Sequence, residues 1–401
     1  MNRNRFIQAG RSGIIAICLS VSAQIVFAQE IDILLKGGHV IDPKNKISAK
    51  MDVAVSNGKI LKVAPNIPAA GAKKVVDVSG MYVAPGLIDI HTHVFTGPNA
   101  GFGHGSSSVK PGYKTFPVFK EQIIDRSRTR VLAYLNVFAP GMVGTAAEQE
   151  DMKALEIEKA DETIKQYGDY IAGVKIGHYS GSDWKPFDEA GALAHKNNRP
   201  LFVECHITAF SLEDQLKHMK AGDILTHAYE NVSERMPVVD ENGKVRPFVL
   251  EARKKGILFD VGHGGVGFWF NQGIPAVKQG LAPDTFGTDM HHNSVNSGMK
   301  DMLNLMSKYL NMGMQTEDII TRASWGAANA IKRPDLGNLS VGSVADIAVI
   351  KVLDGKFGFL DAGGFKLDGN KKFQAEMTIR AGKIVWDLNG MAGVPWSKDL
   401  K

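Results

Sequence analysis

Two histidines stand two residues apart in the apolar run GLIDIHTH, where they are His91 and His93. Side chains two residues apart on a strand project from the same face, so one cation can bind both imidazoles. A strand end that carries two surface histidines would give the same pattern. The pair therefore indicates a metal site only if further ligands converge on it.

Further candidate ligands follow later apolar runs of strand length. In a barrel of parallel strands the carboxyl ends of all strands meet at one mouth, so ligands spread along the chain can converge there. His195 and His218, by contrast, lie in helical segments. Imidazole nitrogen and carboxylate oxygen suit divalent ions, which activate water for hydrolysis. The candidates at predicted strand ends are Lys175, Glu204, His206, His227 and Asp289.

The middle of the chain alternates short apolar runs with helical segments, which predicts parallel βα units. One helix follows Ser211, where Asp214 completes a capping box. No glycine-rich phosphate loop follows the first run, so a (β/α)8 TIM-type barrel is favoured over a doubly wound α/β sheet. The predicted strands are 86–94, 131–138, 170–176, 200–207, 223–229, 256–263 and 284–289.

Both ends of the chain predict β structure. Alternating runs fill residues 31–83, with Asn57-Gly58 at a hairpin position, and similar runs return near the C-terminus around Ala381-Gly382. One small, discontinuous β-sandwich domain built from both termini is expected. The predicted organisation is a signal peptide (1–28), the first part of the β domain (29–84), a metal-binding barrel (85–335) and the second part of the β domain (336–401).

The N-terminus predicts export. Residues 1–28 carry Arg3, Arg5 and Arg11, no acid, and an apolar run from Ile14 to Phe27. This is typical of a secretory signal peptide, and the run is shorter than the ~20 apolar residues of a membrane span. We expect a periplasmic or secreted protein that keeps Cys205 as its one cysteine, so that no intramolecular disulfide forms.

The charge balance excludes several classes of partner. Removing the three N-terminal arginines lowers the formal net charge from +5 to +2. A charge this small gives no electrostatic case for binding nucleic acid or an acidic membrane surface. We expect a small-molecule substrate, no nucleic acid, no membrane after signal removal, and an oligomeric state that the sequence leaves open between monomer and homo-oligomer.

Taken together, the motifs resemble the amidohydrolase superfamily, and within it the dihydroorotase-like amidohydrolase/deacetylase group. The resemblance rests on GLIDIHTH, the lysine of GVKIGHYSG, the histidine of GDILTHAYE, the run FDVGHGG and the aspartate of FGTDMHH. It covers nearly the whole mature chain, including NLSVGSVADIAVIKV near the C-terminus.

The resemblance implies a centre of two divalent metal ions, usually zinc. His91, His93 and Asp289 would bind the first ion and His227 the second. Lys175 would bridge them as its carbamate, N6-carboxylysine, because an ammonium cannot ligate a cation. The ions would lower the pKa of a bridging water and polarise the scissile carbonyl, and Asp289 would carry the proton to the leaving group.

The fifth-strand ligand departs from the family pattern, which has a histidine there. Register places Glu204 at that position, and His206 lies two residues further on, on the same strand face. Zinc accepts carboxylate oxygen as well as imidazole nitrogen, so Glu204 is favoured and His206 is the alternative. A third interpretation is that Glu204 only orients a ligand.

Two more histidines lie just past strand ends. His178 and His263 are candidates for substrate binding, with structural hydrogen bonding as the alternative.

Two further positions depart from the family pattern. Gly177 stands where the related group often has an arginine. About twenty residues of the usual layout are missing near Pro111-Gly112, so that TFPVF (115–119) is a poor second strand, or the loop is remodelled, or the barrel is imperfect.

The sequence therefore predicts an exported metal-dependent amidohydrolase that cleaves a small-molecule amide or ester, like a deacetylase. One alternative is a cyclic amidohydrolase that opens a dihydropyrimidine or hydantoin. Another is a non-catalytic binding protein that keeps the fold. The same ligands serve both enzymatic interpretations, so only assays with linear and cyclic substrates can distinguish them.

Overall fold

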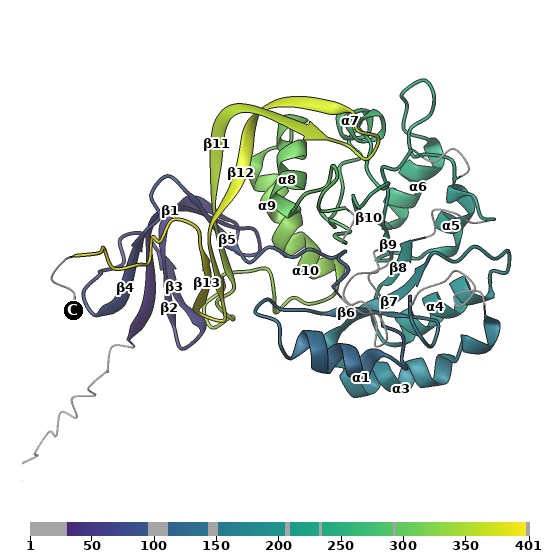
Figure 1. Cartoon of the computed structure of the whole chain (residues 1–401), viewed down its shortest axis with the longest axis horizontal. Coiled ribbons are helices and arrows are strands. Elements are labelled where there is room, and N and C mark those ends of the chain that lie inside the picture. Colours follow the sequence, from purple (N-terminus) through teal and green to yellow (C-terminus); the bar gives the residue numbers. More distant parts are fainter. Residues whose placement is uncertain are drawn as a thin grey trace, which may run out of the picture.

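The computed structural model describes residues 30–94, 111–142, 151–204, 209–231, 235–291 and 294–397. Figure 1 shows a β-rich part and a larger α/β part side by side, with the C-terminal strands β11 and β12 running from one to the other. The domain boundaries expected at 84/85 and 335/336 stay predictions.

The β-rich part is one eight-stranded sheet that combines both ends of the described chain. Its order is β13-β12-β11-β5-β1-β2-β3, and β4 pairs with β1 off this path. Asn57 and Gly58 join β2 to β3 with φ values of 50° and 75°, as the hairpin signal requires. The strands are β1 (Ile31–Asp42), β2 (Ile47–Ser56), β3 (Lys59–Ala64), β4 (Ala72–Asp77), β5 (Tyr82–Pro85), β11 (Ile347–Leu360), β12 (Lys366–Arg380) and β13 (Lys383–Asp387).

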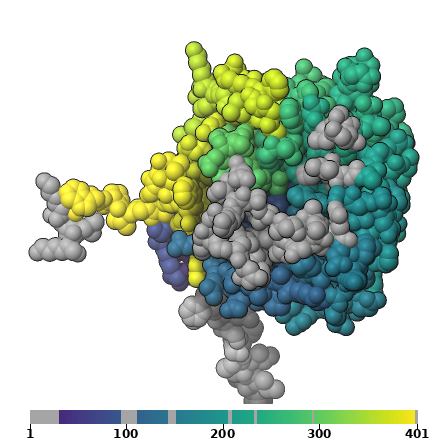
Figure 2. Space-filling view, turned by 45° about the vertical axis from the view of Figure 1, so that its right-hand side comes forward, coloured from purple at the N-terminus to yellow at the C-terminus, as the bar shows by residue number. Residues whose placement is uncertain are grey.

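The hairpin of β11 and β12 also reaches over the α/β part. Phe373 on β12 donates its backbone N–H to Ser307 Oγ at 2.9 Å, and Asn311 Nδ2 donates to the Lys371 carbonyl at 2.8 Å. Both partners lie on helix α8 (Met302–Asn311). Figure 2 shows this yellow-green hairpin lying directly on the green helical surface. The two parts of the molecule are therefore fastened together by strands as well as by the chain connections.

The α/β part is built on a five-stranded parallel sheet in the order β10-β9-β8-β7-β6. Every residue of β7 is buried, which fits an apolar run covered on both faces. The strands are β6 (Ala133–Asn136), β7 (Ile171–Gly177), β8 (Leu201–Glu204), β9 (Ile224–Leu225) and β10 (Leu258–Phe259). This parallel order follows the chain, as a (β/α)8 barrel requires.

Two predicted strands, 86–94 and 284–289, are not regular strands, which corrects the sequence prediction. Each makes isolated parallel bridges, Thr92 with Met290 and Thr285 with Asp260. The reason lies in Asp89, whose Oδ1 accepts the backbone N–H groups of Thr288 and His91 at 3.0 and 3.1 Å. Side-chain hydrogen bonds here take the place of ladder bonds. The two segments still extend the parallel order beyond β10.

The segment that could have supplied a second strand is helical. Helix α1 (Phe116–Phe119) begins after Thr115, has a proline in its first turn and continues into a π-helical turn, Lys120–Ile124. Proline fits the first turn of a helix but cannot donate to a β ladder. The interpretation of TFPVF as a substitute strand is therefore wrong, and this part of the wall is remodelled.

Helices pack around the parallel sheet, and within the described residues none is long and apolar enough to cross a membrane. Helix α5 confirms its predicted start, because Ser211 Oγ accepts the N–H of Asp214 at 3.1 Å. The other helices are α3 (Ile157–Tyr167), α4 (Lys185–Lys196), α6 (Pro247–Lys255), α7 (Phe270–Lys278), α9 (Thr316–Thr321) and α10 (Ala327–Ala330), and α5 spans Leu212–His218.

Candidate metal centre

Four side chains converge at the carboxyl ends of the parallel segments. Their potential ligand atoms, two imidazole nitrogens and two carboxylate oxygens, all lie within 4.8 Å of one another, and all four residues are buried. They come from four segments far apart in the chain. The residues are His91, Glu204, His227 and Asp289, each of which the sequence placed at a strand end.

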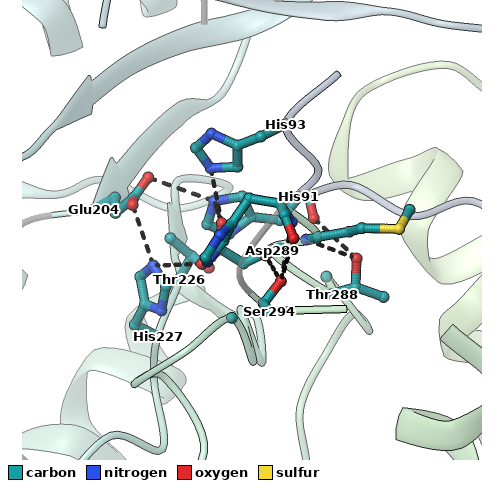
Figure 3. A network of polar contacts seen from close by, with 12 residues as sticks. His91, His93, Glu204, Thr226, His227, Thr288, Asp289 and Ser294 are labelled. Atoms are coloured by element: carbon teal, nitrogen blue, oxygen red, sulfur yellow. Dashed lines mark hydrogen bonds and ion pairs between the residues drawn. The ribbon is translucent and has the colours of Figure 1, made fainter. Parts of the chain in front are cut away.

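Asp289 connects the HxH pair. Its Oδ1 lies 2.7 Å from His93 Nε2 and 3.3 Å from His91 Nε2, as Figure 3 shows. The backbone of Asp289 is left-handed, with φ of 48°, and its N–H donates to the His91 carbonyl at 2.6 Å. Ser294 Oγ donates to the Asp289 carbonyl at 3.2 Å. A strained backbone held from both sides fixes this carboxylate between the imidazoles.

Glu204 occupies the centre of the cluster. Its Oε2 lies 3.4 Å from His91 Nε2, while its Oε1 lies 3.2 Å from His227 Nε2 and 3.0 Å from His178 Nε2. One carboxylate thus lies close to both His91 and His227. Lys175 is fully buried and forms an ion pair with the same Oε2. The lysine is therefore brought to the site together with the histidines.

A chain of hydrogen bonds behind His91 fixes its tautomer. Thr226 Oγ1 donates to Asp260 Oδ2 at 2.8 Å, so it accepts from His91 Nδ1 at 2.7 Å. Asp260 also accepts from Thr285 Oγ1 and the Gly287 N–H, both at 2.7 Å. With the proton on Nδ1, the lone pair of His91 Nε2 points into the cluster. Metal-binding histidines in proteins commonly have such an outer partner.

The electrostatics of the site favour an ionised Asp289. Burial alone would raise the pKa of this carboxyl, yet the positive field of His93, and to a smaller extent that of His227, holds the pKa well below its ordinary value. A carboxylate that stays ionised can bind a cation. By contrast, burial raises the pKa of Asp89, behind the cluster, to about 7.

The donor set fits a divalent metal ion. Bonds of ~2.0–2.2 Å from zinc to nitrogen or oxygen place any two ligand atoms no more than about 4.4 Å apart. The four atoms of the cluster come close to this spacing, and His93 borders it through Asp289. Several buried carboxylates and imidazoles gathered this closely are otherwise costly, because charge in the interior needs compensation.

The close approach of Gly264 to Asp289 gives a first test. Gly264 has φ of 43°, and a Cβ there would collide with Asp289 Oδ2. We expect Gly264→Ala to destabilise the protein by about 1–2 kcal/mol through the left-handed backbone alone, and to weaken metal binding by displacing the carboxylate. Gly265→Ala is the matched control, because a Cβ there meets nothing within 4 Å. Equal metal content and urea midpoints for the two variants would contradict the assignment of Asp289.

The predicted substrate-binding histidines have different surroundings. His178 is partly exposed and borders the cluster through Glu204. His263 is fully buried; its Nδ1 bonds the Gly264 carbonyl at 3.0 Å and its Nε2 accepts from Lys308 Nζ at 2.6 Å. Contact between His263 and a substrate would need neighbouring side chains to move, so its role stays a prediction. His206 lies outside the described residues.

Sequence reasoning missed the outer partners of the cluster. Asp260 stands inside the apolar run ILFDV, where a charged residue is costly unless several donors satisfy it. That signal could have identified it. Thr226, next to His227, gave no comparable signal, since threonine is common in strands. Lys308, the partner of His263, lies in a helical pattern and gave no signal either.

Comparisons with known proteins agree with the fold. The amidohydrolase family model matches residues 270–385. A deacetylase of Brucella anthropi is 27% identical, over 82% of this chain and 87% of its own length. A dihydroorotase of Citrifermentans bemidjiense is 30% identical, over 80% of this chain and 89% of its own.

Solved structures share the fold. An adenine deaminase superposes with a TM-score of 0.81 at 24% identity, covering 89% of this chain and all (100%) of that one. A dihydroorotase superposes with a TM-score of 0.77 at 24% identity, covering 88% and 99% of the two chains. With the sequence match to the dihydroorotase over most of both chains, these findings show that this chain belongs to the amidohydrolase family and is a hydrolase that acts on carbon–nitrogen bonds.

Proposed function

We propose that the protein is a deacetylase-like enzyme that removes an acyl group from a small-molecule amide or ester with a pair of divalent metal ions, zinc in the first instance. The observation that carries the proposal is the buried cluster of His91, Glu204, His227 and Asp289. Several curated relatives carry the name deacetylase, which supports the acyl-transfer reading over others.

The proposed ligand sets divide the cluster in two. His91, His93 and Asp289 would hold one ion, and His227 and Glu204 the other. When bound, the ions supply an activated water and polarise the carbonyl of the substrate. The Thr226–Asp260 chain keeps His91 Nε2 free of a proton, so that it remains a ligand.

Proton transfer is assigned to Asp289. Its carboxylate lies 2.7 Å from His93 Nε2 and 3.3 Å from His91 Nε2, and it would take the proton of the activated water. Transfer to the leaving group follows. His178, partly exposed beside Glu204, is placed to contact the substrate and is proposed to orient its acyl carbonyl.

Carboxylation of Lys175 belongs to this proposal. The ammonium of Lys175 pairs with Glu204, and carboxylation would replace that attraction with repulsion between two anions unless cations lie between them. The carbamate is therefore expected only in the metal-loaded protein. Protein reconstituted with zinc should then require bicarbonate to reach two equivalents of metal.

Metal analysis with and without bicarbonate tests the centre. We expect about two equivalents of zinc in the wild type with bicarbonate and fewer than one in Lys175→Ala. The exposed Lys254→Ala is the matched control and should keep the wild-type content. No stoichiometric binding by the wild type would contradict the proposal and favour a non-catalytic binding protein. Binding of two equivalents of zinc without bicarbonate would reject the carbamate but would remain compatible with a metal-dependent enzyme.

Opening of a cyclic amide is the second candidate, because one relative matched over most of its length is named dihydroorotase. The ligands serve both reactions, so the assay must compare linear N-acyl compounds with dihydropyrimidines and hydantoins. A higher kcat/KM on the linear substrates is expected. Export stays a prediction, because residues 1–28 lie outside the described part of the chain.

A further inference from the structure

The barrel wall has a gap where a second strand would stand. The parallel order runs from β6 to β10 and continues through the bridges Asp260–Thr285 and Thr92–Met290 to the segment 86–94. Within the described residues, no pairing joins this segment to β6. A closed barrel has a strand between them, and its side chains help to fill the interior.

A cavity of about 390 Å³ occupies this gap. Ile88 and Thr92 line it from one edge, Leu132 and Tyr134 line it from the other, and Ala172 lies beneath. Its volume falls within the range of ~300–1,000 Å³ that is usual for small-molecule sites. The cavity therefore has the size of a ligand site, and its lining does not include His91, Glu204, His227 or Asp289.

The lining of this cavity is mainly apolar. Ile90, Tyr134 and Ile331 line the cavity and belong to one buried apolar cluster, which also contains Phe202. Along the open side, apolar side chains are only half-buried; they are Leu87, Ile88, Val131 and Leu132. Apolar side chains that stay partly accessible around a cavity are typical of a binding site.

One end of the cavity is cationic. Arg130 and Arg380 both line it, and Asp346 neutralises only one of them, through its bond to Arg130 Nη2 at 3.0 Å. Arg380 Nη1 donates to backbone carbonyls, while its buried Nε has no hydrogen-bond partner. Asp89, the other acid in the described lining, has both oxygens engaged by Thr288. The Arg380 guanidinium thus keeps an unused donor, which a turn of the side chain would present to an anion in the cavity.

We propose that this gap binds a carboxylate with a long apolar chain, such as a fatty acid. The chain would lie between the segment 86–94 and β6, in the position of the missing strand, and the carboxylate would accept from the guanidinium of Arg380 after this side chain turns toward the cavity. Charge-assisted hydrogen bonds to a guanidinium hold such a headgroup, and burial of the chain supplies the remaining affinity.

The edge of β6 favours an apolar chain over an added peptide strand. A peptide would bind through main-chain hydrogen bonds along the edge. The N–H of Asn136, at the upper end of β6, already donates to the Pro111 carbonyl at 2.9 Å. Part of the edge is therefore occupied by the protein itself, whereas an acyl chain needs no main-chain partner.

Calorimetric titration of the full-length protein with dodecanoate tests the proposal, with dodecanol as the uncharged comparison. We expect saturable binding of one dodecanoate, and Arg380→Gln should weaken it roughly tenfold, about 1.4 kcal/mol, without changing dodecanol binding. The matched control is Arg126→Gln, whose side chain is exposed and makes only a 3.8 Å ion pair. Binding of dodecanoate that is indifferent to Arg380 would overturn the assignment of the headgroup.

Leu132→Trp tests the apolar part of the cavity separately from the headgroup. Leu132 is half-buried in the cavity wall, so a larger side chain can fill the space without entering the packed core. We expect both ligands to lose saturable binding while thermal unfolding and metal content stay as in the wild type. Undiminished binding by this variant would overturn the proposal, as would absence of 1:1 binding by the wild type. Tight binding of an apolar strand-forming peptide in place of dodecanoate would reject it in favour of strand addition.

Discussion

Glu204→Gln is expected to lose metal affinity by at least 100-fold and kcat/KM on an N-acyl substrate by about 10³-fold or more. The carboxylate faces His91 on one side and His227 on the other, so it serves both halves of the site. Loss of an outer partner of a ligand already costs ~10–100-fold in metal affinity, and a direct ligand should cost more. The amide also removes the negative charge that balances Lys175 in the interior.

The measurement is zinc content after dialysis against a weak chelator, together with steady-state kinetics. Glu213→Gln is the matched control, because Glu213 lies partly exposed on helix α5, where it makes a surface ion pair with Lys217. Thermal unfolding of each variant separates loss of metal from loss of fold. If the Glu204→Gln variant kept both its zinc content and its kcat/KM, Glu204 would not be a ligand, and His206 would be the alternative ligand of this strand.

Much of the site could be predicted because it depends on topology more than on detail. Once parallel βα units are recognised, the carboxyl ends of their strands must converge, so His91, His227 and Asp289 had to approach one another. The position of an apolar run favoured Glu204 over His206, but the two-residue period of a strand puts both on one face, so His206 stays the alternative. These inferences use spacing, which the sequence states directly.

Other features could not be predicted because they depend on side-chain packing between distant segments. The ion pair of Lys175 with Glu204 joins two strands, and its geometry follows from their register. The same holds for the Thr226–Asp260 chain behind His91. Asp89 replaced ladder bonds with side-chain bonds, so the first and last segments of the barrel departed from regular strands.

The wall of the barrel illustrates how a local preference can override an expected topology. The family layout requires a strand near residue 115, but the short segment there carries Pro117 in the position that favours the first turn of a helix. Because this segment forms a helix, the segment 86–94 and β6 stay apart, and a cavity lies between them. The cluster of His91, Glu204, His227 and Asp289 forms nevertheless, because these residues lie on other segments.

A second large effect is expected from Lys308, a buried lysine that lies outside the metal cluster. Its Nζ donates to His263 Nε2 at 2.6 Å and to the Gly298 carbonyl at 2.7 Å, and it lies 5.8 Å from the centre of the Phe268 ring. Burial lowers the pKa of Lys308 from 10.5 to about 7, although Asp361 and Asp301 partly oppose this. The folded protein therefore binds this proton much more weakly than the unfolded chain.

The sign of the pH effect follows from this difference. Above pH 10.5 the amine is neutral in both states, and it has no effect on the free energy of unfolding. As the pH falls from 10.5 towards 7, the unfolded chain takes up a proton that the folded protein does not, so stability falls by up to ~1.4 kcal/mol per pH unit. Below about pH 7 both states are protonated and the loss stays constant.

Lys308→Met removes this pH dependence while it keeps an unbranched side chain on Phe268. The variant also loses two hydrogen bonds, but that loss is the same at every pH. We expect the stability of the variant relative to the wild type, measured as the difference in the free energy of unfolding, to be about 3 kcal/mol larger at pH 7 than at pH 9.5, as obtained from urea titrations of the metal-free protein. The exposed Lys244→Met should show no such difference. An equal effect of Lys308→Met at both pH values would mean that the lysine is charged inside the folded protein, and that His263, Gly298 and the neighbouring aspartates compensate its burial in full.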